Sequence, residues 1–284
     1  YGTDAIPEEY GATKTTAYNI HRGSKVVSFS NIFLDNIFSL ENSSYSSVSS
    51  FQIDKTDNKY NLIAILTDNT KTQLTDPSKF VGYTKKADGE LTSILLKNNG
   101  LHIEIQLNRE DSIGKLHSAG IKDILIESAI TAIQDFEDSV SAVDEEDKIS
   151  AYTNWTDLMK GTITSTFTKD GSELVRTLNP DKIFISQENE NDTYIISGRS
   201  LILARNVGIH MYTDIILTKE NEKTPEGFLD IMVTALASMH DLNGNSKYSN
   251  SPNKSIYIVK PKMHGPEEVA ATVELFSRVE KALN

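Results

Sequence analysis

Residues 255–266 read SIYIVKPKMHGP, and this stretch decides the fold because it contains one whole strand-to-helix transition. The run Ile256 to Val259 is apolar and rich in β-branched and aromatic residues, which is typical of a buried strand. A polar turn follows, and apolar residues then recur at helical spacing from Pro266 to Leu283. The sequence therefore predicts a strand followed by a helix, the unit from which parallel sheets and barrels are built.

The same order occurs twice upstream. Strands are predicted at Ala129 to Ile133 and at Leu201 to Ala204, and helices at Lys148 to Met159 and at Glu226 to His240. A (β/α)8 barrel needs eight such units in about 250 residues, and only about three fit here. We therefore predict an α/β fold that is either an open sheet or part of a TIM (β/α)8 barrel.

The first half of the chain has a different pattern, with one helix expected from Lys25 to Leu40. Short strands should follow, two of them joined by an Asn99-Gly100 hairpin turn. We expect residues 1–125 to form an α+β domain with a mostly antiparallel sheet, and residues 126–284 to form the open sheet or partial barrel, interrupted by a β excursion near residues 170–198. The strands expected are Tyr60 to Leu66, Phe80 to Tyr83, Leu91 to Leu96, Leu101 to Leu107, Lys182 to Ile185 and Thr193 to Ile196.

Composition excludes several classes of protein. The 284 residues are 38% hydrophobic, which is enough for a sizeable core, and a net charge of −12 argues against a nucleic-acid partner. There is no cysteine, no apolar run of about 18 residues and no leader pattern at the start. We expect a cytoplasmic protein with no membrane partner. Both ends look cut, so we also expect an internal piece of a longer chain.

Polar clusters follow each predicted strand of the second half. They comprise Asp135 to Ser139, then Arg205 with Asn206, then Lys260 to His264. The carboxyl ends of parallel strands meet at one edge, so these groups should converge. Such a set suits an anionic substrate, a hard divalent cation held partly through water, and an oxyanion stabilised by Arg205. Ordinary solvation of loops, or a structural ion pair of Arg205 with Asp135 or Glu137, would give the same pattern.

Four motifs make the resemblance to a known family specific. Residues 135–140 (DFEDSV), 205–208 (RNVG), 95–102 (LLKNNGLH) and 255–266 resemble motifs of malate synthase G and occur in that family's order. The resemblance implies a TIM barrel with an α/β domain inserted after its first strand, so that residues 1–125 are the inserted domain and residues 126–284 are a partial TIM barrel. It also implies Mg²⁺-dependent condensation of acetyl-CoA with glyoxylate to give malate, by a parent enzyme expected to be a monomer.

The resemblance also implies roles for the residues of the clusters. Arg205 matches the family's catalytic arginine, which binds glyoxylate and stabilises the enolate formed from acetyl-CoA. Asp135 and Glu137, with Asp138 beside them, match acids that orient this arginine and the waters around the magnesium. The chain is expected to contain the support for Arg205 but not the whole site.

Two further positions, Ser139 and Arg176, match contacts to acetyl-CoA in the family. The histidine after the arginine motif is shifted by one place, to His210, which puts any role for it in doubt. The magnesium-ligand carboxylates lie on later barrel strands of the family and its general base lies beyond the barrel. We therefore expect no metal ligand in this chain, and we predict that the chain is inactive alone.

Two alternatives remain open. A malyl- or citramalyl-CoA lyase-like enzyme would use the same arginine and magnesium chemistry but favour cleavage, and the inserted domain speaks against it. A non-catalytic binding module built on the insert would bind neither acetyl-CoA nor glyoxylate, so calorimetry separates it from both enzymes.

Overall fold

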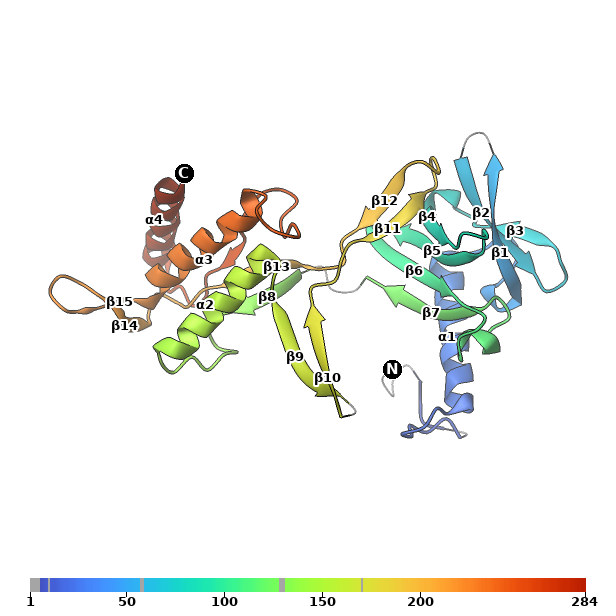
Figure 1. The fold of residues 1–284 in the computed structure, drawn as a ribbon, viewed down its shortest axis with the longest axis horizontal. Coiled ribbons are helices and arrows are strands. Elements are labelled where there is room, and N and C mark those ends of the chain that lie inside the picture. The colour runs from blue at the N-terminus through green and yellow to red at the C-terminus, as the bar shows by residue number, and fades with distance from the viewer. Residues whose placement is uncertain (1–5, 10, 57–58, 128–130, 170) are drawn as a thin grey trace. The chain divides into compact units, whose positions relative to one another are not determined.

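The computed structural model describes the chain except for residues 1–5, 10, 57–58, 128–130 and 170. The chain forms two compact units (Figure 1). Unit 1 comprises Tyr1–Ser128 and Lys182–Ile196, and unit 2 comprises Ala129–Asp181 and Ser197–Asn284. Within the described residues, no helix combines the length and the apolar character that crossing a bilayer requires.

Unit 1 starts with helix α1, Ile20–Ile37. The side chain of Asn19 accepts hydrogen bonds from the backbone N–H groups of His21 and Arg22, and an asparagine in this position satisfies the unpaired donors of a helix start. The helix therefore begins and ends earlier in the chain than the predicted range from Lys25 to Leu40.

Two sheets follow, and all their strand pairs are antiparallel. One has the order β1-β2-β3 and the other the order β12-β11-β4-β5-β6-β7. The strands are β1 Val48–Thr56, β2 Lys59–Leu66, β3 Lys71–Gln73, β4 Phe80–Lys85, β5 Leu91–Asn98, β6 Leu101–Leu107, β7 Ile121–Ile126, β11 Lys182–Ser186 and β12 Thr193–Ile196.

The predicted hairpin between β5 and β6 is confirmed. Asn98 pairs with Leu101, so the loop consists of Asn99 and Gly100, whose φ angles are 50° and 83°. Asparagine and glycine tolerate this left-handed conformation, which matches the twist of the two strands.

The β excursion predicted near residues 170–198 contains strands β11 and β12, and the structure assigns these strands to a different unit than expected. Both strands lie where the sequence predicts them, but they belong to unit 1, because β11 pairs with β4 through Ile185 with Tyr83 and Ser186 with Gly82. Gly82 permits this approach, since a Cβ atom there would come within 2.9 Å of the carbonyl oxygen of Ile185. The pairing is between distant parts of the chain, so local sequence patterns do not reveal it.

Unit 1 has a continuous apolar core. Helix α1 contributes Leu34, and strands of both sheets contribute most of the remainder, including Leu62, Phe80, Ile94 and Ile105. Each of these five side chains is buried, so the core joins the helix to both sheets.

Unit 2 is built on a parallel sheet with the order β16-β13-β8. A helix follows each strand, as predicted, and the architecture of the chain is thus mixed α/β. Residues 129 and 130 of the predicted strand at 129–133 lie outside the described residues. The elements are β8 Thr131–Asp135, α2 Glu145–Lys160, β13 Leu201–Arg205, α3 Glu226–Leu242, β16 Ile258–Val259 and α4 Pro266–Leu283.

Helices α2 and α3 lie side by side (Figure 1). Trp155 and Met159 of α2 pack with Ala237 of α3, Ala204 of β13 and Phe136 in one core. A second core joins α3 to α4. The helices thereby hold the strands whose carboxyl ends carry the polar clusters.

Two hairpins of unit 2 were not predicted. They are formed by β9 Thr164–Lys169 with β10 Ser172–Thr177, and by β14 Tyr212–Leu217 with β15 Lys223–Pro225. Every residue of β10 is exposed, so this strand lacks the alternation of buried and exposed positions that marks a strand in a sequence.

Candidate active site

The candidate site is centred on an ion pair between Asp135, the last residue of β8, and Arg205, the last residue of β13. The parallel register puts these two residues opposite each other. Arg205 Nε donates to Asp135 Oδ1 at 2.7 Å, and Nη2 donates to Oδ2 at 2.5 Å. A bidentate pair of this kind fixes the plane of the guanidinium as well as its position.

Asp135 accepts further hydrogen bonds from the loop that follows it. The backbone N–H groups of Glu137 and Ser139 each donate at 3.0 Å, and the Ser139 hydroxyl donates at 2.5 Å. The hydrogen bond from Arg205, followed by those from the loop, holds the pKa of Asp135 well below its usual range. The same pairing raises the pKa of Arg205, so both groups are ionised at neutral pH.

The third strand end contributes Lys262, which follows β16. Its Nζ lies 2.5 Å from Glu137 Oε1 and 2.9 Å from Asp138 Oδ1. The hydrogen bond to Glu137, and then that to Asp138, raises the pKa of Lys262. The hydrogen bond from Lys262 in turn lowers the pKa of Asp138. The φ angle of Lys262 is 57°, a left-handed conformation that is uncommon for lysine. The lysine thus links the third strand end to the acidic loop after β8.

The predicted convergence of the three strand ends is confirmed by these contacts. Asp135, Glu137, Asp138, Ser139 and Arg205 all lie in one hydrogen-bonded cluster, which we call the strand-end cluster, and Lys262 completes it. Their roles in binding and catalysis stay predictions.

Arg176 lies elsewhere. It is exposed on β10, and its guanidinium sits 4.6 Å from the ring centre of Phe167 on the same hairpin. Within the described residues, no hydrogen bond or ion pair joins Arg176 to the strand-end cluster. His210 is exposed.

A second set of polar side chains, between α2 and α3, was missed from the sequence. Lys148 and Tyr152 on α2 face Glu226 and Asp230 on α3. Lys148 Nζ lies 2.5 Å from Glu226 Oε1 and 2.9 Å from Asp230 Oδ1, and the Tyr152 hydroxyl donates to Asp230 Oδ1 at 2.6 Å. Both pairs have i, i+4 spacing, which places each pair on one helix face. A polar pair at that spacing, on a helix face that also carries apolar residues, is the signal that could have marked each pair, although it does not show that the two pairs meet.

The carboxylates of the strand-end cluster do not form a metal site by themselves. Both oxygens of Asp135 are taken by Arg205 and the loop, and Glu137 pairs with Lys262. Throughout the described part of the chain, no group of three or more histidine, aspartate or glutamate side chains is placed to hold a metal ion.

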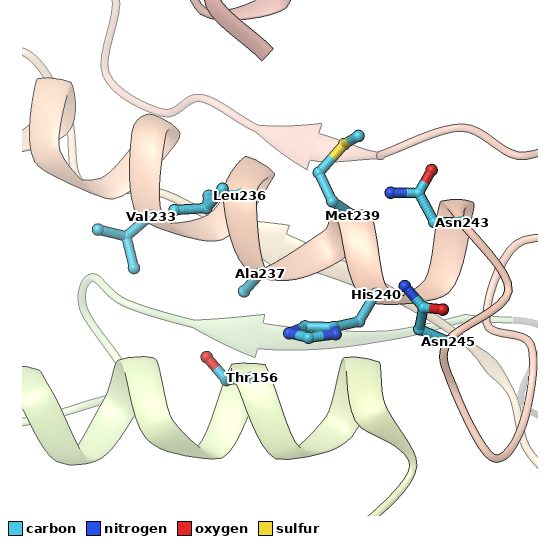
Figure 2. A pocket seen from close by; sticks show the side chains of 8 residues that line it. All are labelled: Thr156, Val233, Leu236, Ala237, Met239, His240, Asn243 and Asn245. Atoms are coloured by element: carbon cyan, nitrogen blue, oxygen red, sulfur yellow. The ribbon is translucent and has the colours of Figure 1, made fainter. Parts of the chain in front are cut away.

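Two hollows in unit 2 lie away from the strand-end cluster. One, of about 370 Å³, is open and lies between α2 and the second half of α3. Figure 2 shows His240 of α3 projecting toward the side of α2 on which Thr156 lies. The other, of about 720 Å³, is lined mainly by apolar residues such as Leu203, Ile258 and Phe276. Neither hollow contains a residue of the cluster, so neither is the candidate site.

Unit 2 therefore belongs to the α/β class, with helices packed on a parallel sheet. An arginine–carboxylate pair lies at the carboxyl edge of that sheet. Two family models match the chain. Residues 18–98 match the malate synthase G alpha-beta insertion domain, and residues 201–284 match the malate synthase TIM barrel domain.

Curated relatives match the chain over its whole length. The chain is 46% identical to malate synthase G of Halalkalibacterium halodurans and 44% identical to that of Corynebacterium efficiens, over 284 residues in each case. These alignments cover 100% of this chain but only 38% and 37% of the relatives. The chain belongs to the malate synthase G family, and it spans less than two fifths of the length of these relatives.

Proposed function

We propose that the chain is the part of a malate synthase that supplies the catalytic arginine, and that the whole protein condenses acetyl-CoA with glyoxylate and water to give malate and CoA. The observation that carries the proposal is the bidentate pair of Arg205 with Asp135 at the carboxyl edge of a parallel sheet. Catalytic groups of (β/α)8 enzymes lie at this edge.

Arg205 is suited to an anionic ligand and to a developing oxyanion. Its side chain is 29% exposed, and its bonds to Asp135 use Nε and Nη2. No described residue accepts a hydrogen bond from Nη1, so this nitrogen can donate to glyoxylate or to the enolate. When the methyl group of acetyl-CoA loses a proton, charge grows on the thioester oxygen, and a fixed cation stabilises that charge without reorganising.

The remaining steps balance without further reactants. The enolate carbon forms a bond with the aldehyde carbon of glyoxylate while the C=O π bond breaks, and the alkoxide takes up one proton, which balances the proton lost by the methyl group, to become the hydroxyl of malate. Water then attacks the malyl thioester, the C–S bond breaks, and CoA leaves as the thiol. Asp135 stays ionised throughout, because its hydrogen bonds keep its pKa low, and it holds Arg205 in one orientation.

Acetyl-CoA would contact Ser139 and Arg176. The Ser139 hydroxyl already donates to Asp135, so its lone pairs are what it offers to a ligand. Arg176 is exposed on β10 and carries the positive charge that suits the anionic nucleotide portion of the cofactor. This proposal requires that the hairpin of β9 and β10 approach the bound acetyl-CoA.

The rest of the whole protein would complete the site. We propose that its cation is Mg²⁺, held by ligands outside this chain, that its general base also lies outside, and that strands β8, β13 and β16 are part of a TIM barrel. A monomer in the cytoplasm would agree with the family, with the net charge of −12 and with the absence of cysteine.

An activity assay with acetyl-CoA, with and without glyoxylate, decides between the candidate functions. The whole protein, supplied with Mg²⁺, is expected to release free thiol from acetyl-CoA only when glyoxylate is present, with malate formed in equal amount. The 284-residue chain, assayed alike, is expected to form none. Cleavage of malyl-CoA without condensation would favour the lyase, and absence of binding to both substrates in calorimetry would favour a non-catalytic module.

A further inference from the structure

We infer that Asp230 and Lys260 are positioning residues, which clamp the backbone of Val207 at its N–H and at its carbonyl and thereby fix the backbone that carries Arg205. The inference rests on the proposed function, because it assigns these residues a role in the same reaction. It concerns the segment immediately after Arg205, whereas Asp135 holds the arginine at its side chain.

The clamp consists of one hydrogen bond at each end of the residue. The Val207 N–H donates to Asp230 Oδ2 at 2.7 Å, and the Val207 carbonyl accepts from Lys260 Nζ. Val207 is itself buried, so these bonds form away from water. The backbone before it is also tied, since the Asn206 N–H donates to the carbonyl of Val259 at 3.0 Å. Residues 205–207 therefore have little freedom to shift.

The negative charge of Asp230 in the clamp is compensated by a neighbouring lysine on α2. Asp230 is 0% exposed and Lys148 is 2% exposed, and Lys148 pairs with both Asp230 and Glu226. Lys148 thus pairs with two carboxylates, and Asp230 also acts electrostatically on Lys260. Burial lowers the pKa of Lys260, while Asp230 and Glu137 oppose this shift. Buried ion pairs of this kind add little net stability compared with apolar packing, because desolvation offsets their attraction, so a positional role explains them better.

The packing leaves no spare room around Lys260. Gly227, in the first turn of α3, lies against the clamp. A Cβ atom at Gly227 would collide with the Lys260 ammonium and would lie 2.9 Å from the carbonyl oxygen of Val207. Gly227→Ala therefore displaces Lys260 while it retains every charge and suits a helix better than glycine does.

The first experiment compares two acids of the same helix in the whole protein. Asp230→Asn is expected to lower kcat about 10- to 100-fold, because small displacements of a catalytic group cost this much, with KM for acetyl-CoA within about twofold. Asp241→Asn is the matched control. Asp241 is also buried on α3 and accepts two backbone N–H bonds, from Asn250 at 2.6 Å and Ser251 at 2.9 Å, but it does not touch residues 205–207. If both variants have equal kcat, the inference is wrong.

Coupling to Arg205 distinguishes positioning from general damage. In an Arg205→Lys background, Asp230→Asn is expected to lower the remaining kcat less than about threefold, since both changes act through the same group. An equal loss in both backgrounds would overturn the inference. If Arg205→Lys alone leaves kcat unchanged, the proposed function of Arg205 fails instead, and the two failures are thus separate.

Gly227→Ala keeps the test decisive if Asp230→Asn does not fold. It is expected to lower kcat about tenfold, because it displaces the Lys260 ammonium from the Val207 carbonyl, and a cooperative unfolding transition above the assay temperature shows that the variant is folded. Wild-type kcat in this variant would contradict the inference.

Discussion

The two units bury different kinds of side chain. Unit 1 encloses a continuous apolar core, and among its described residues the buried charged side chain is Glu104, whose partner Lys182 lies 2.5 Å away. Unit 2 has smaller apolar cores and buries Asp135, Lys148 and Asp230 close to one strand edge. The difference indicates that unit 1 is built for packing, while unit 2 uses its interior to hold charged groups in fixed positions.

The comparison shows that one kind of interaction stabilises the fold and another kind places the reactive groups. Apolar burial stabilises a fold by about 25 cal/mol for each Å² removed from water, but it is not directional. Ion pairs with bidentate geometry are directional, although burial makes their net contribution to stability small. A site that must hold a guanidinium within a few tenths of an ångström needs the second kind of interaction.

The largest effect on stability is expected in unit 1. Phe80→Ala should lower the free energy of unfolding by about 3–5 kcal/mol, because this buried ring leaves a cavity in the core. Urea unfolding followed by far-UV circular dichroism measures the change. Trp155 is the one tryptophan of the chain and lies buried in unit 2, so its fluorescence reports that unit.

The fluorescence transition is expected to be unchanged in Phe80→Ala, since each unit has its own cores. An equal shift of both signals would break the comparison, because the units would then unfold together.

Asp135→Asn is expected to lower the free energy of unfolding of unit 2 by about 2 kcal/mol, because Arg205 loses its carboxylate partner. The pKa of Asp135 is lower in the folded chain than in the unfolded one, so its contribution is present above about pH 4 and is lost as pH falls through the folded pKa. The difference between wild type and variant, read from Trp155 fluorescence, should be constant from about pH 5 to 8 and shrink in more acidic solution.

The control for this pH dependence is Asp54→Asn in unit 1, whose partner Lys71 lies 3.6 Å away in an exposed pair. Its effect is expected to be small at every pH. A difference for Asp135→Asn that grows as the solution becomes acidic would have the opposite sign to that expected from a lowered pKa in the folded chain.

A smaller effect is expected at the hairpin of unit 1. Gly100→Ala should cost about 1 kcal/mol, because the φ angle of 83° is unfavourable for a residue with a Cβ atom. Gly100→Asn is the matched variant and should cost less, since asparagine tolerates this conformation. Equal unfolding midpoints for the two variants by circular dichroism would show that backbone conformation is not the cause.

The smallest effect is expected for Lys223→Met in unit 2. Lys223 pairs with Asp214 at 3.0 Å, but the two side chains are 60% and 70% exposed, so the pair should contribute less than about 0.5 kcal/mol. Trp155 fluorescence during urea unfolding again provides the measurement. A loss as large as that of Asp135→Asn would remove the distinction between site pairs and surface pairs.

The sequence predicts those parts of the fold that depend on neighbouring residues. The apolar spacing places α3 and α4 correctly at their starts, Glu226 and Pro266, and the Asn99-Gly100 turn gives the register of β5 and β6. It does not predict the exposed hairpin of β9 and β10, which has no buried face, or the pairing of β11 with β4.

The candidate site also has a part that the sequence predicts and a part that it does not. The strand-end rule brings Asp135 and Arg205 together without a structure, because parallel strands end at one edge. The clamp around Val207 depends on how α2 faces α3, and that arrangement is tertiary. Lys148 and Asp230 lie 82 positions apart in the chain, and no local pattern pairs them.

The most direct test of the role of Arg205 is the malate-forming activity of the whole protein with Arg205→Lys. The variant keeps the charge but loses the bidentate fork, so kcat should fall more than about 100-fold while KM for acetyl-CoA changes little. Arg278→Lys, which changes an exposed arginine paired with Glu274, is the control and should keep wild-type kcat. Arg205→Lys with kcat within about threefold of wild type would contradict the claim that the strand-end arginine is the catalytic group.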